Sequence, residues 1–255
     1  MYYTPLLILI LLTPSSVMAK KKYYQPSLET SWHWQLDGKL NMKRDVDLYI
    51  VDLFDTKVCQ IQRLHQSKKK VIAYFSAGSY EAWRKDAKDF PKAVLGEKMD
   101  GWDERWLDIK NPKVRAIMIA RLKLARRKGF DGVEADNVDG YENETGFDLS
   151  AQQQQTYNIF LAKQAHRLGL AIALKNDVEQ IEALEPYFDF HINEECHVYA
   201  ECNRTRAFIQ HNKPVFNAEY DPQKHQEFCK KRHKGFHMLT LPLGLNDSFR
   251  MECRP

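Results

Sequence analysis

Four acidic residues lie within the stretch GFDGVEADNVDGY, which spans residues 129–141 and otherwise has the composition of a buried strand. Carboxylates are costly to bury without partners, so this pattern indicates either a solvated loop or the rim of a catalytic site. A second acidic pair, Glu194-Glu195, follows another apolar run. Two carboxylates that flank one cleft can cleave a glycosidic bond, one as nucleophile or base and the other as the acid that protonates the leaving oxygen. We therefore select Asp136 and Glu194 as the candidate catalytic pair.

The elements that must position these acids are predicted from apolar runs of β-type residues. Eight such runs occur, at residues 32–35, 47–52, 71–75, 131–136, 171–175, 188–193, 215–218 and 236–241. Most are separated by segments with helical apolar spacing, an alternation typical of parallel strands joined by crossover helices. The sequence therefore predicts an α/β fold, a single-domain (β/α)8 TIM-type barrel with parallel strands.

Two of the predicted helices have clear boundaries. One should begin at Asn111-Pro112 and end at Gly129, and the next should begin with a capping box at Ser150–Gln153 and end at Gly169. The connection over residues 79–111 is long and contains Trp83, Trp102 and Trp106. We expect it to carry short helices over the mouth of the barrel.

Polar residues are concentrated where the predicted strands end, which is where barrels of this kind place their active sites. Alternation along the fourth strand directs Glu134 and Asp136 towards the barrel axis, and Val133 and Ala135 towards the helices. The residues at or just beyond the strand ends are Asp52, Asp55, Glu134, Asp136, Asn137, Lys175, Asn176, Asp177, Asn193, Glu194, Glu195, Glu219 and Tyr220.

Two alternatives stay open at this point. Glu134 and Asp136 could pair with Lys175 in a buried structural network instead of acting on a substrate. On the sixth strand, alternation would send Glu195 inward and Glu194 sideways, so periodicity alone does not choose between these two glutamates.

The N-terminus has the pattern of a signal peptide, with an unbroken apolar run at Leu6–Leu12 and the small-residue ending Val17-Met18-Ala19. This run is too short to span a bilayer, and no later segment approaches the roughly 20 apolar residues that a membrane helix needs. We expect residues 1–19 to be a signal peptide, residues 20–30 a flexible N-terminal segment and residues 31–255 the catalytic barrel domain. The protein is thus predicted to be secreted or periplasmic, with no stable membrane span.

The charged residues give a formal net charge of +4 at pH 7. Lysines and arginines are dispersed and form only small clusters, such as residues 20–22 and 68–70, which is typical of a solvated surface. We expect a monomer with no nucleic-acid partner.

Five cysteines in an exported chain indicate disulfides and leave at least one thiol unpaired. Cys196 and Cys202 are close enough in sequence for a disulfide between them to close one short loop. Cys229 and Cys253 could tie the C-terminal tail to the barrel, which would leave Cys59 as a free, buried thiol on a helix. The spacing does not decide the pairing, but the absence of a C-x-x-C pattern favours disulfides over a metal site.

Several motifs occur in a fixed order: Asp52-Leu-Phe-Asp55, Ala73-Tyr-Phe-Ser-Ala-Gly-Ser79, Gly132-Val-Glu-Ala-Asp-Asn-Val-Asp139, Lys175-Asn176 and Asn193-Glu-Glu-Cys196. With these motifs the chain resembles the endo-α-1,4-polygalactosaminidases, glycoside hydrolase family 114, from Trp32 to about Leu241. The resemblance implies a (β/α)8 barrel that cuts α-1,4-linked galactosamine polymers without a metal or organic cofactor. It also implies that Asp136 and Glu194 carry catalysis, which selects Glu194 over Glu195 by analogy.

A partly deacetylated galactosamine polymer is cationic, and an acidic cleft would attract it although the protein as a whole is basic. Trp34, Tyr74 and Tyr220 could present apolar faces to sugar rings or could simply fill the barrel. We expect the substrate to contact Trp34, Asp52, Tyr74, Ser76, Glu134, Asn137, Asp139, Lys175, Asn176, Asn193, Glu195, Glu219 and Tyr220.

The two acids should differ in role. Asp136, near Asn137, Lys175 and Asn176, is predicted to be the nucleophile. Glu194, beside the like charge of Glu195, is predicted to be the acid/base, and this division would give retention of anomeric configuration.

Two other functions fit the same residues. A barrel of this fold could bind a polysaccharide without cutting it, because a fold does not establish a reaction. A metal-dependent hydrolase could hold a divalent cation between Asp136, Asn137 and Asp139, although this run lacks the Gly and distal Glu of a Ca²⁺ loop.

Overall fold

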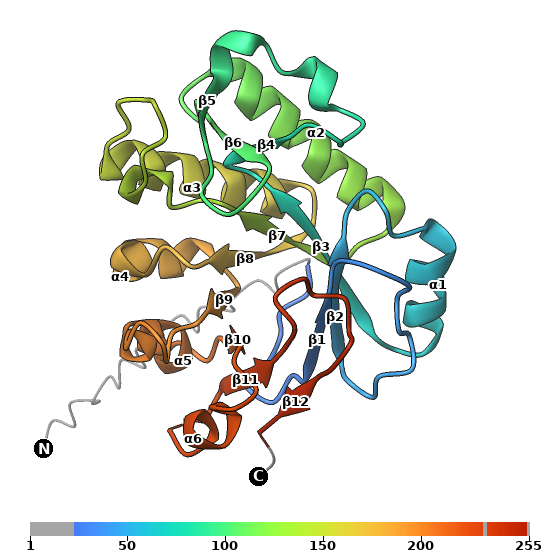
Figure 1. Cartoon of the computed structure of the whole chain (residues 1–255). Helices are drawn as coiled ribbons and strands as arrows, with labels where there is room; N and C mark the ends of the chain where they lie inside the picture. Colours follow the sequence, from blue (N-terminus) through green and yellow to red (C-terminus); the bar gives the residue numbers. More distant parts are fainter. Residues whose placement is uncertain (1–22, 232–233, 254–255) are drawn as a thin grey trace, which may run out of the picture.

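The structure, a computed structural model, describes residues 23–231 and 234–253. A curled sheet forms its centre, and eight parallel strands follow one another around this sheet in chain order, with helices outside it (Figure 1). All eight predicted strands are present, and the predicted barrel fold is confirmed. The strands are β1 (Trp32–Gln35), β2 (Leu48–Asp52), β3 (Lys70–Ser76), β7 (Gly132–Asp136), β8 (Ala171–Lys175), β9 (Phe190–Glu194), β10 (Val215–Glu219) and β11 (Phe236–Thr240).

The ring is completed between its last and first strands without a regular ladder. A short strand, β12 (Met251–Glu252), pairs antiparallel with β11, and no ladder joins β11 to β1 within residues 23–231 and 234–253. Instead, Trp32 Nε1 donates to the His237 carbonyl at 3.1 Å, and the Arg250 guanidinium donates to the Trp32 carbonyl at 2.9 Å. These contacts hold the chain that leads into β12 against β1.

Alternation along the strands divides the apolar core into two layers. Val133 and Ala135 belong to the layer that packs against the helices, as predicted, so Glu134 and Asp136 face the barrel axis. Burying each large apolar side chain contributes about 1.5–3 kcal/mol, so the apolar pattern decides which face of each strand points inward. The layer at the axis contains Trp32, Trp34, Leu48, Ile50, Ile72, Ala171, Ala173, Phe190, Ile192, Phe216, Ala218, Leu239, Leu241 and Leu245.

The helices are longer on the first half of the sheet than on the second (Figure 1). The first half is covered by α1 (Val58–Gln66), α2 (Pro112–Lys128) and α3 (Ala151–Arg167). The second half carries α4 (Ile181–Leu184), α5 (Arg206–Gln210) and α6 (His225–Cys229). Short 3-10 helices lie at Ala87–Asp89, Lys92–Val94, Gly140–Glu142, Val178–Gln180, Glu185–Tyr187 and Cys202–Thr205.

Both helices with predicted boundaries have the expected caps. At the start of α2, the Asn111 side chain accepts a hydrogen bond from the Lys113 N–H at 2.9 Å, and Gly129 ends the helix with φ 93°. Only glycine adopts this left-handed backbone without steric cost. Ser150 and Gln153 form the capping box of α3.

The connection from β3 to α2 differs from the prediction. It contains two 3-10 helices, but it also forms a three-stranded antiparallel sheet in the order β4 (Ser79–Glu81), β6 (Glu104–Leu107), β5 (Leu95–Lys98). The pairing of β4 with β6 joins segments that are distant in sequence, so no local pattern reports it. Trp106 is buried in this unit, whereas Trp83 and Trp102 are exposed.

The first described residues lie against the barrel. The Tyr23 ring stacks on His166 with 4.3 Å between centroids, and the Gln25 amide donates to Asp189 at 3.0 Å. The flexibility expected for residues 20–30 stays a prediction, and the expected signal peptide lies outside the described residues. Within the described part of the chain, no helix has the length and apolar character needed to cross a bilayer.

Candidate active site

The carboxyl ends of the strands open into two adjoining depressions that together form the candidate site. The central cavity is lined by Trp34, Leu36, Tyr74, Met99, Trp102, Glu104, Asp136, Asn137, Asp139, Lys175, Asn176, Glu194, Leu243, Gly244 and Leu245. The side groove is lined by Trp102, Asp139, Glu142, Asn176, Asp177, Val178, Glu194, Glu195, Tyr199, Glu201, Tyr220 and Leu243. Because they share Trp102, Asp139, Asn176, Glu194 and Leu243, the two depressions are continuous.

Asp136, the last residue of β7, receives three hydrogen bonds. Its donors are Lys175 Nζ at 2.9 Å, the Tyr74 hydroxyl at 2.9 Å and the N–H of Asn137 at 2.8 Å. Asn137 adopts φ 59°, a left-handed conformation that asparagine tolerates better than most residues. These donors orient the Asp136 carboxylate and compensate its negative charge.

Glu194, the last residue of β9, faces Asp136 across the strand between them. Its carboxylate lies 2.7 Å from Lys175 Nζ and accepts a hydrogen bond from the Tyr220 hydroxyl. Its N–H donates to the Asn176 side chain at 3.0 Å. The two candidate acids therefore meet in the central cavity.

The alternation predicted for β9 was wrong. Phe190 and Ile192 belong to the layer at the barrel axis, so Glu194 is the next inward residue of this strand. Glu195 follows the strand end, has φ 55° and lines the side groove. The two large apolar side chains set the phase of the strand, and they carry Glu194 into the cavity.

Lys175 ends β8 and connects the acids on the neighbouring strands. Burial disfavours a charged lysine, but the carboxylates of Asp136, Glu194 and Glu134 outweigh this effect and hold the pKa of Lys175 well above its ordinary value. Its ammonium group also lies 5.2 Å from the Trp34 ring centroid. A lysine that stays charged here opposes a divalent cation at Asp136, which weighs against the metal-dependent alternative.

Glu134 lies beneath this pair and is fully buried. One of its oxygens is 3.8 Å from Lys175 Nζ, and burial raises the pKa of Glu134 well above its ordinary value. The structural network considered from the sequence therefore exists. Asp136 belongs to this network and also lines the central cavity, whereas Glu134 does not appear among the lining residues.

Besides Lys175, seven of the predicted substrate contacts line the site. Tyr74 and Tyr220 direct their hydroxyl groups at Asp136 and Glu194, so they are hydrogen-bond donors here as well as apolar surfaces. Burial and the nearby Asp136 charge raise the pKa of Asp139 to about 6. Trp34, Tyr74, Asn137, Asp139 and Asn176 line the central cavity, and Glu195 and Tyr220 line the side groove.

Two predicted substrate residues instead support the rim. The Asp52 carboxylate pairs with Arg84 at 2.8 Å and accepts hydrogen bonds from the N–H groups of Phe54 and Asp55, so its charge is already compensated. The Ser76 hydroxyl is buried and accepts a hydrogen bond from the Asn137 side chain at 2.9 Å. Neither residue lines the central cavity or the side groove, which corrects the expectation that both contact the substrate there.

Asn193 and Glu219 are also placed differently from the prediction. Asn193 donates to the Glu194 carbonyl at 2.9 Å, and Glu219 accepts hydrogen bonds from the N–H of His197 at 3.0 Å and from Asn217 at 2.8 Å. Both are fully buried, on the face of β9 and β10 that points away from the barrel axis. They hold the backbone around Glu194 rather than line either depression.

The structure adds several residues that the sequence analysis missed. Met99 and Glu104 reach the central cavity from the sheet of β4, β5 and β6, together with Trp102. Burial raises the pKa of Glu104 to about 7, and its carboxylate accepts a hydrogen bond from the Ser79 hydroxyl. The tryptophans of the long connection were the available signal, but the position of Glu104 depends on pairing between β4 and β6.

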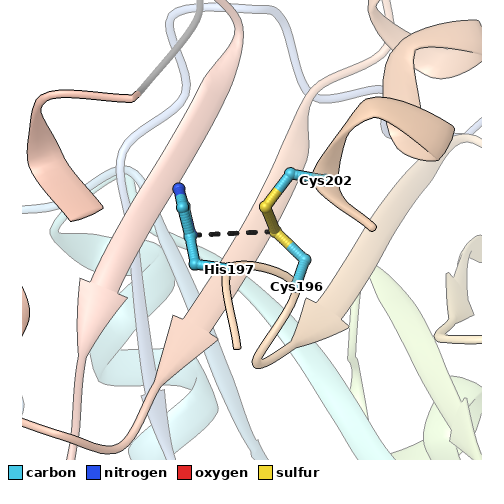
Figure 2. Close-up of side chains that lie close together, drawn as sticks. All are labelled: Cys196, His197 and Cys202. Carbon is cyan, nitrogen blue, oxygen red and sulfur yellow. Dashed lines mark hydrogen bonds between the residues drawn. A yellow bond between two sulfur atoms is a disulfide. The ribbon is translucent and has the colours of Figure 1, made fainter. Parts of the chain in front are cut away.

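A disulfide fastens the segment that follows Glu194. Figure 2 shows Cys196 bonded to Cys202, with the His197 ring beside the bridge. A second disulfide joins Cys229 to Cys253, so both expected pairs are present. Cys59 is free, as expected, but it is exposed on α1 rather than buried.

In the described part of the chain, two groups of His, Cys, Asp or Glu side chains lie close enough together to hold a metal ion, and each group contains one of the two disulfides. One group is Cys196, His197 and Cys202, and the other is His225, Cys229 and Cys253. Metal ligation by cysteine requires the thiolate, and a disulfide sulfur is not one. His197 Nδ1 is in addition 2.9 Å from the Glu219 carboxylate.

Alkylation should report this cysteine pattern. In the oxidised protein, we expect iodoacetamide to modify Cys59 alone, because it is the one free and exposed thiol among the described cysteines. Cys196, Cys202, Cys229 and Cys253 should react only after reduction. Peptide mapping by mass spectrometry checks this, and modification of Cys196 before reduction would contradict the bridge.

Comparisons with known proteins agree with this geometry. The model of glycoside-hydrolase family GH114 matches residues 13–254. Ega3 of Aspergillus fumigatus, solved in complex with galactosamine, is 36% identical, with a TM-score of 0.87 over 94% of this chain and 100% of that chain. The glycoside hydrolase domain of PelA from Pseudomonas aeruginosa, 15% identical, shares the fold with a TM-score of 0.66 over 86% of this chain and 96% of that one.

A Deinococcus radiodurans protein described as uncharacterized is 28% identical over 243 residues, which cover 78% of this chain and 75% of that protein. The family match, by contrast, extends over nearly the whole chain, and Ega3 matches it over almost the same length. The chain therefore belongs to glycoside-hydrolase family GH114 and is a glycoside hydrolase.

Proposed function

We propose that this glycoside hydrolase is an exported enzyme that cleaves α-1,4-linked galactosamine-containing polysaccharide at internal bonds, with Asp136 and Glu194 as its catalytic pair. The observation that carries the proposal is the contact of both carboxylates with Lys175 Nζ, at 2.9 and 2.7 Å, in an open cavity at the strand ends. The galactosamine bound to Ega3 supports an amino sugar as substrate. The two disulfides support export, because such bridges persist in oxidising compartments.

The separation of the acids supports a retaining mechanism. Because both carboxylates contact one nitrogen, their nearest oxygens are less than about 6 Å apart, closer to the about 5–5.5 Å of retaining pairs than to the roughly 6.5–9.5 Å of inverting pairs. One carboxylate attacks the anomeric carbon while the other protonates the leaving oxygen. The second then removes a proton from water, which hydrolyses the glycosyl-enzyme.

The surroundings of the acids support Asp136 as the nucleophile and Glu194 as the acid/base. Asp136 is held by three donors, including the N–H of Asn137, and its side chain is 14% exposed. Glu194 is 27% exposed and lines both depressions, so water can reach it for the second step. The continuity of the cavity and groove lets a polymer extend past the pair, which supports cleavage at internal bonds.

Product analysis tests this proposal. The purified protein should convert α-1,4-linked galactosamine polymer into oligosaccharides of mixed length, and NMR of the first product should show the α-configured reducing end that retention gives. α-1,4-Linked galacturonan has the same linkage with the opposite charge and serves as the matched control. Release of monomer alone would contradict internal cleavage, and a first-formed β-anomer would contradict retention. Binding without any cleavage would favour the non-catalytic alternative.

A further inference from the structure

The turn that joins β3 to β4, residues 76–79, lies directly against the backbone of Asp136 and Asn137. The N–H groups of Ala77 and Gly78 donate to the Asp136 carbonyl at 2.8 and 3.1 Å. A Cβ on Gly78 would lie 1.6 Å from the Asn137 carbonyl oxygen, so only glycine permits this approach. The carbonyl of the peptide group between Asp136 and Asn137 is thus held by the turn. Its N–H points in the opposite direction, as in any trans peptide, and reaches the Asp136 carboxylate at 2.8 Å.

The side chain of Asn137 is held by the same turn. Its Nδ2 donates to Ser76 Oγ at 2.9 Å and lies 3.3 Å from Ser79 Oγ. Both serines are fully buried, and their hydroxyl groups contact each other. The left-handed backbone of Asn137 is uncommon for a residue with a Cβ. The serines stabilise this conformation by holding the side chain, and the conformation is the one that directs the Asn137 N–H at Asp136.

Glu104, on β6, accepts the last hydrogen bond of this series. Its carboxylate accepts from the Ser79 hydroxyl, which has only one hydrogen to donate. Ser79 Oγ must therefore accept from the Ser76 hydroxyl, which leaves the lone pairs of Ser76 Oγ for Asn137 Nδ2 and for the Ser79 N–H at 3.0 Å. The carboxylate of Glu104 thus sets the direction of both hydroxyl groups that hold Asn137.

The backbone that carries the two serines is itself fixed. The three successive carbonyls of residues 76–78 accept hydrogen bonds from Arg121 at 2.7 Å, from the Tyr157 hydroxyl at 2.7 Å and from the Leu107 N–H at 2.9 Å. A catalytic side chain keeps its geometry when the groups that support it are held in this way. The hydroxyl groups therefore hold Asn137 from a fixed position.

We propose that Glu104 is a positioning residue for Asp136. It orients the hydroxyl groups of Ser79 and Ser76. These in turn hold Asn137, whose N–H then stays on the Asp136 carboxylate. The role rests on the proposed function, in which Asp136 is the nucleophile, because a misplacement of about 1 Å at a reacting group can lower the rate about 100-fold. Glu104 needs no contact with the polymer for this role, although it reaches the central cavity.

Hydrolysis kinetics of variants test this role. Glu104→Leu removes the acceptor and Ser79→Ala removes its donor, and each should lower kcat about tenfold with little change in KM, because the effect acts on Asp136 rather than on binding. The double variant should also lose about tenfold rather than about 100-fold, since both changes interrupt the same series. Glu104→Gln keeps an oxygen that accepts from Ser79, so its kcat should stay within about threefold of wild type.

Glu97→Leu is the matched control. Glu97 is exposed on β5, in the same small sheet as Glu104, and it lines neither the central cavity nor the side groove. The same change of residue type should leave both kcat and KM as in the wild type.

A direct contact between Glu104 and the polymer would give a different pattern. Glu104→Leu would then raise KM, Ser79→Ala would have little effect, and the losses would multiply in the double variant. This pattern would overturn the positioning role, and so would equal losses of kcat in Glu104→Gln and Glu104→Leu. If Glu104→Leu does not fold, Ser79→Ala and Glu104→Gln decide.

Crystal structures separate this role from the proposed function. If the wild-type protein cleaves no polymer, the proposed function fails, but the structures of wild type and Glu104→Leu still show whether Glu104 holds Asn137. In the variant, we expect Asn137 Nδ2 to leave Ser76 and the Asn137 N–H to leave the Asp136 carboxylate. Unchanged contacts of Asn137 would overturn the positioning role.

Discussion

Asp136→Asn and Glu194→Gln should each lower kcat for polymer hydrolysis by on the order of 100-fold or more while the protein stays folded. Each replacement removes one carboxylate from the pair that meets at Lys175 and keeps its shape and its capacity to accept a hydrogen bond. An amide can neither attack the anomeric carbon at a useful rate nor exchange a proton with the leaving oxygen. A reducing-end assay measures the loss, and circular dichroism checks the fold.

Glu195→Gln is the matched control for this experiment. Glu195 is adjacent in sequence and carries the same charge, but it lies beyond the end of β9 and lines the side groove. We expect its replacement to keep most of the wild-type turnover. If Glu195→Gln loses activity and Glu194→Gln retains it, the catalytic glutamate has been assigned to the wrong residue.

Lys175→Met should reduce both activity and stability. The side chain of Lys175 is 2% exposed and is the shared cation of Glu134, Asp136 and Glu194. Breaking a buried ion pair by removing one partner costs about 3–5 kcal/mol, because the remaining charge is left without compensation. We expect a loss near the lower end of this range at pH 7, since Asp136 and Glu194 are partly exposed, together with a fall in kcat of about 100-fold.

The stability loss should depend on pH in a defined direction. Burial raises the pKa of Glu134, and the positive charge of Lys175 partly opposes this effect. Without Lys175, the folded-state pKa of Glu134 should therefore rise farther above the pKa of an unfolded glutamate. A folded state that binds more protons than the unfolded state loses stability as the pH rises. The unfolded-state pKa is the same for both proteins, so the deficit of Lys175→Met relative to wild type should be smallest where Glu134 is protonated in both folded proteins. It should grow as the pH rises through the raised folded-state pKa that Glu134 has in the wild type.

Urea unfolding of both proteins at pH 7 and at about pH 5 would measure this effect. Lys123→Met is a suitable control, because Lys123 is exposed on α2 and the same change of residue type should then have little effect. An equal deficit at both pH values would show that lost packing, rather than uncompensated carboxylates, destabilises the variant.

The candidate site was only partly predictable from its residues. The position of Asp136 was predictable because Val133 and Ala135 on the same strand pack against the helices. Alternation then directs Asp136 towards the barrel axis at the end of the strand, where it lines the cavity. The inward phase of β9 follows the same rule, because burial of Phe190 and Ile192 at the axis outweighs the preferences of the polar residues at the strand end. Where apolar side chains alternate strongly, burial decides which face points inward and sequence patterns report it.

Polar residues at strand ends did not follow such a rule. Asp52 seemed equivalent to Asp136, but Arg84, from a distant segment, compensates its charge. Glu219 seemed to belong to the cleft, but it turns outward and binds His197. A carboxylate is stable wherever donors reach it, so its type alone does not reveal which donors the fold will supply.

The sequence by itself was sufficient for the eight strands and for the helix caps at Asn111 and Ser150, because apolar alternation and local capping act over a few residues or along one element. It suggested both disulfides, but the spacing of the cysteines did not decide their pairing. Tertiary structure alone decided that Lys175 joins two acids from different strands, and that the sheet of β4, β5 and β6 brings Glu104 to the cavity. These arrangements depend on contacts between segments far apart in the chain, whose register is set by packing of the whole barrel rather than by any local preference.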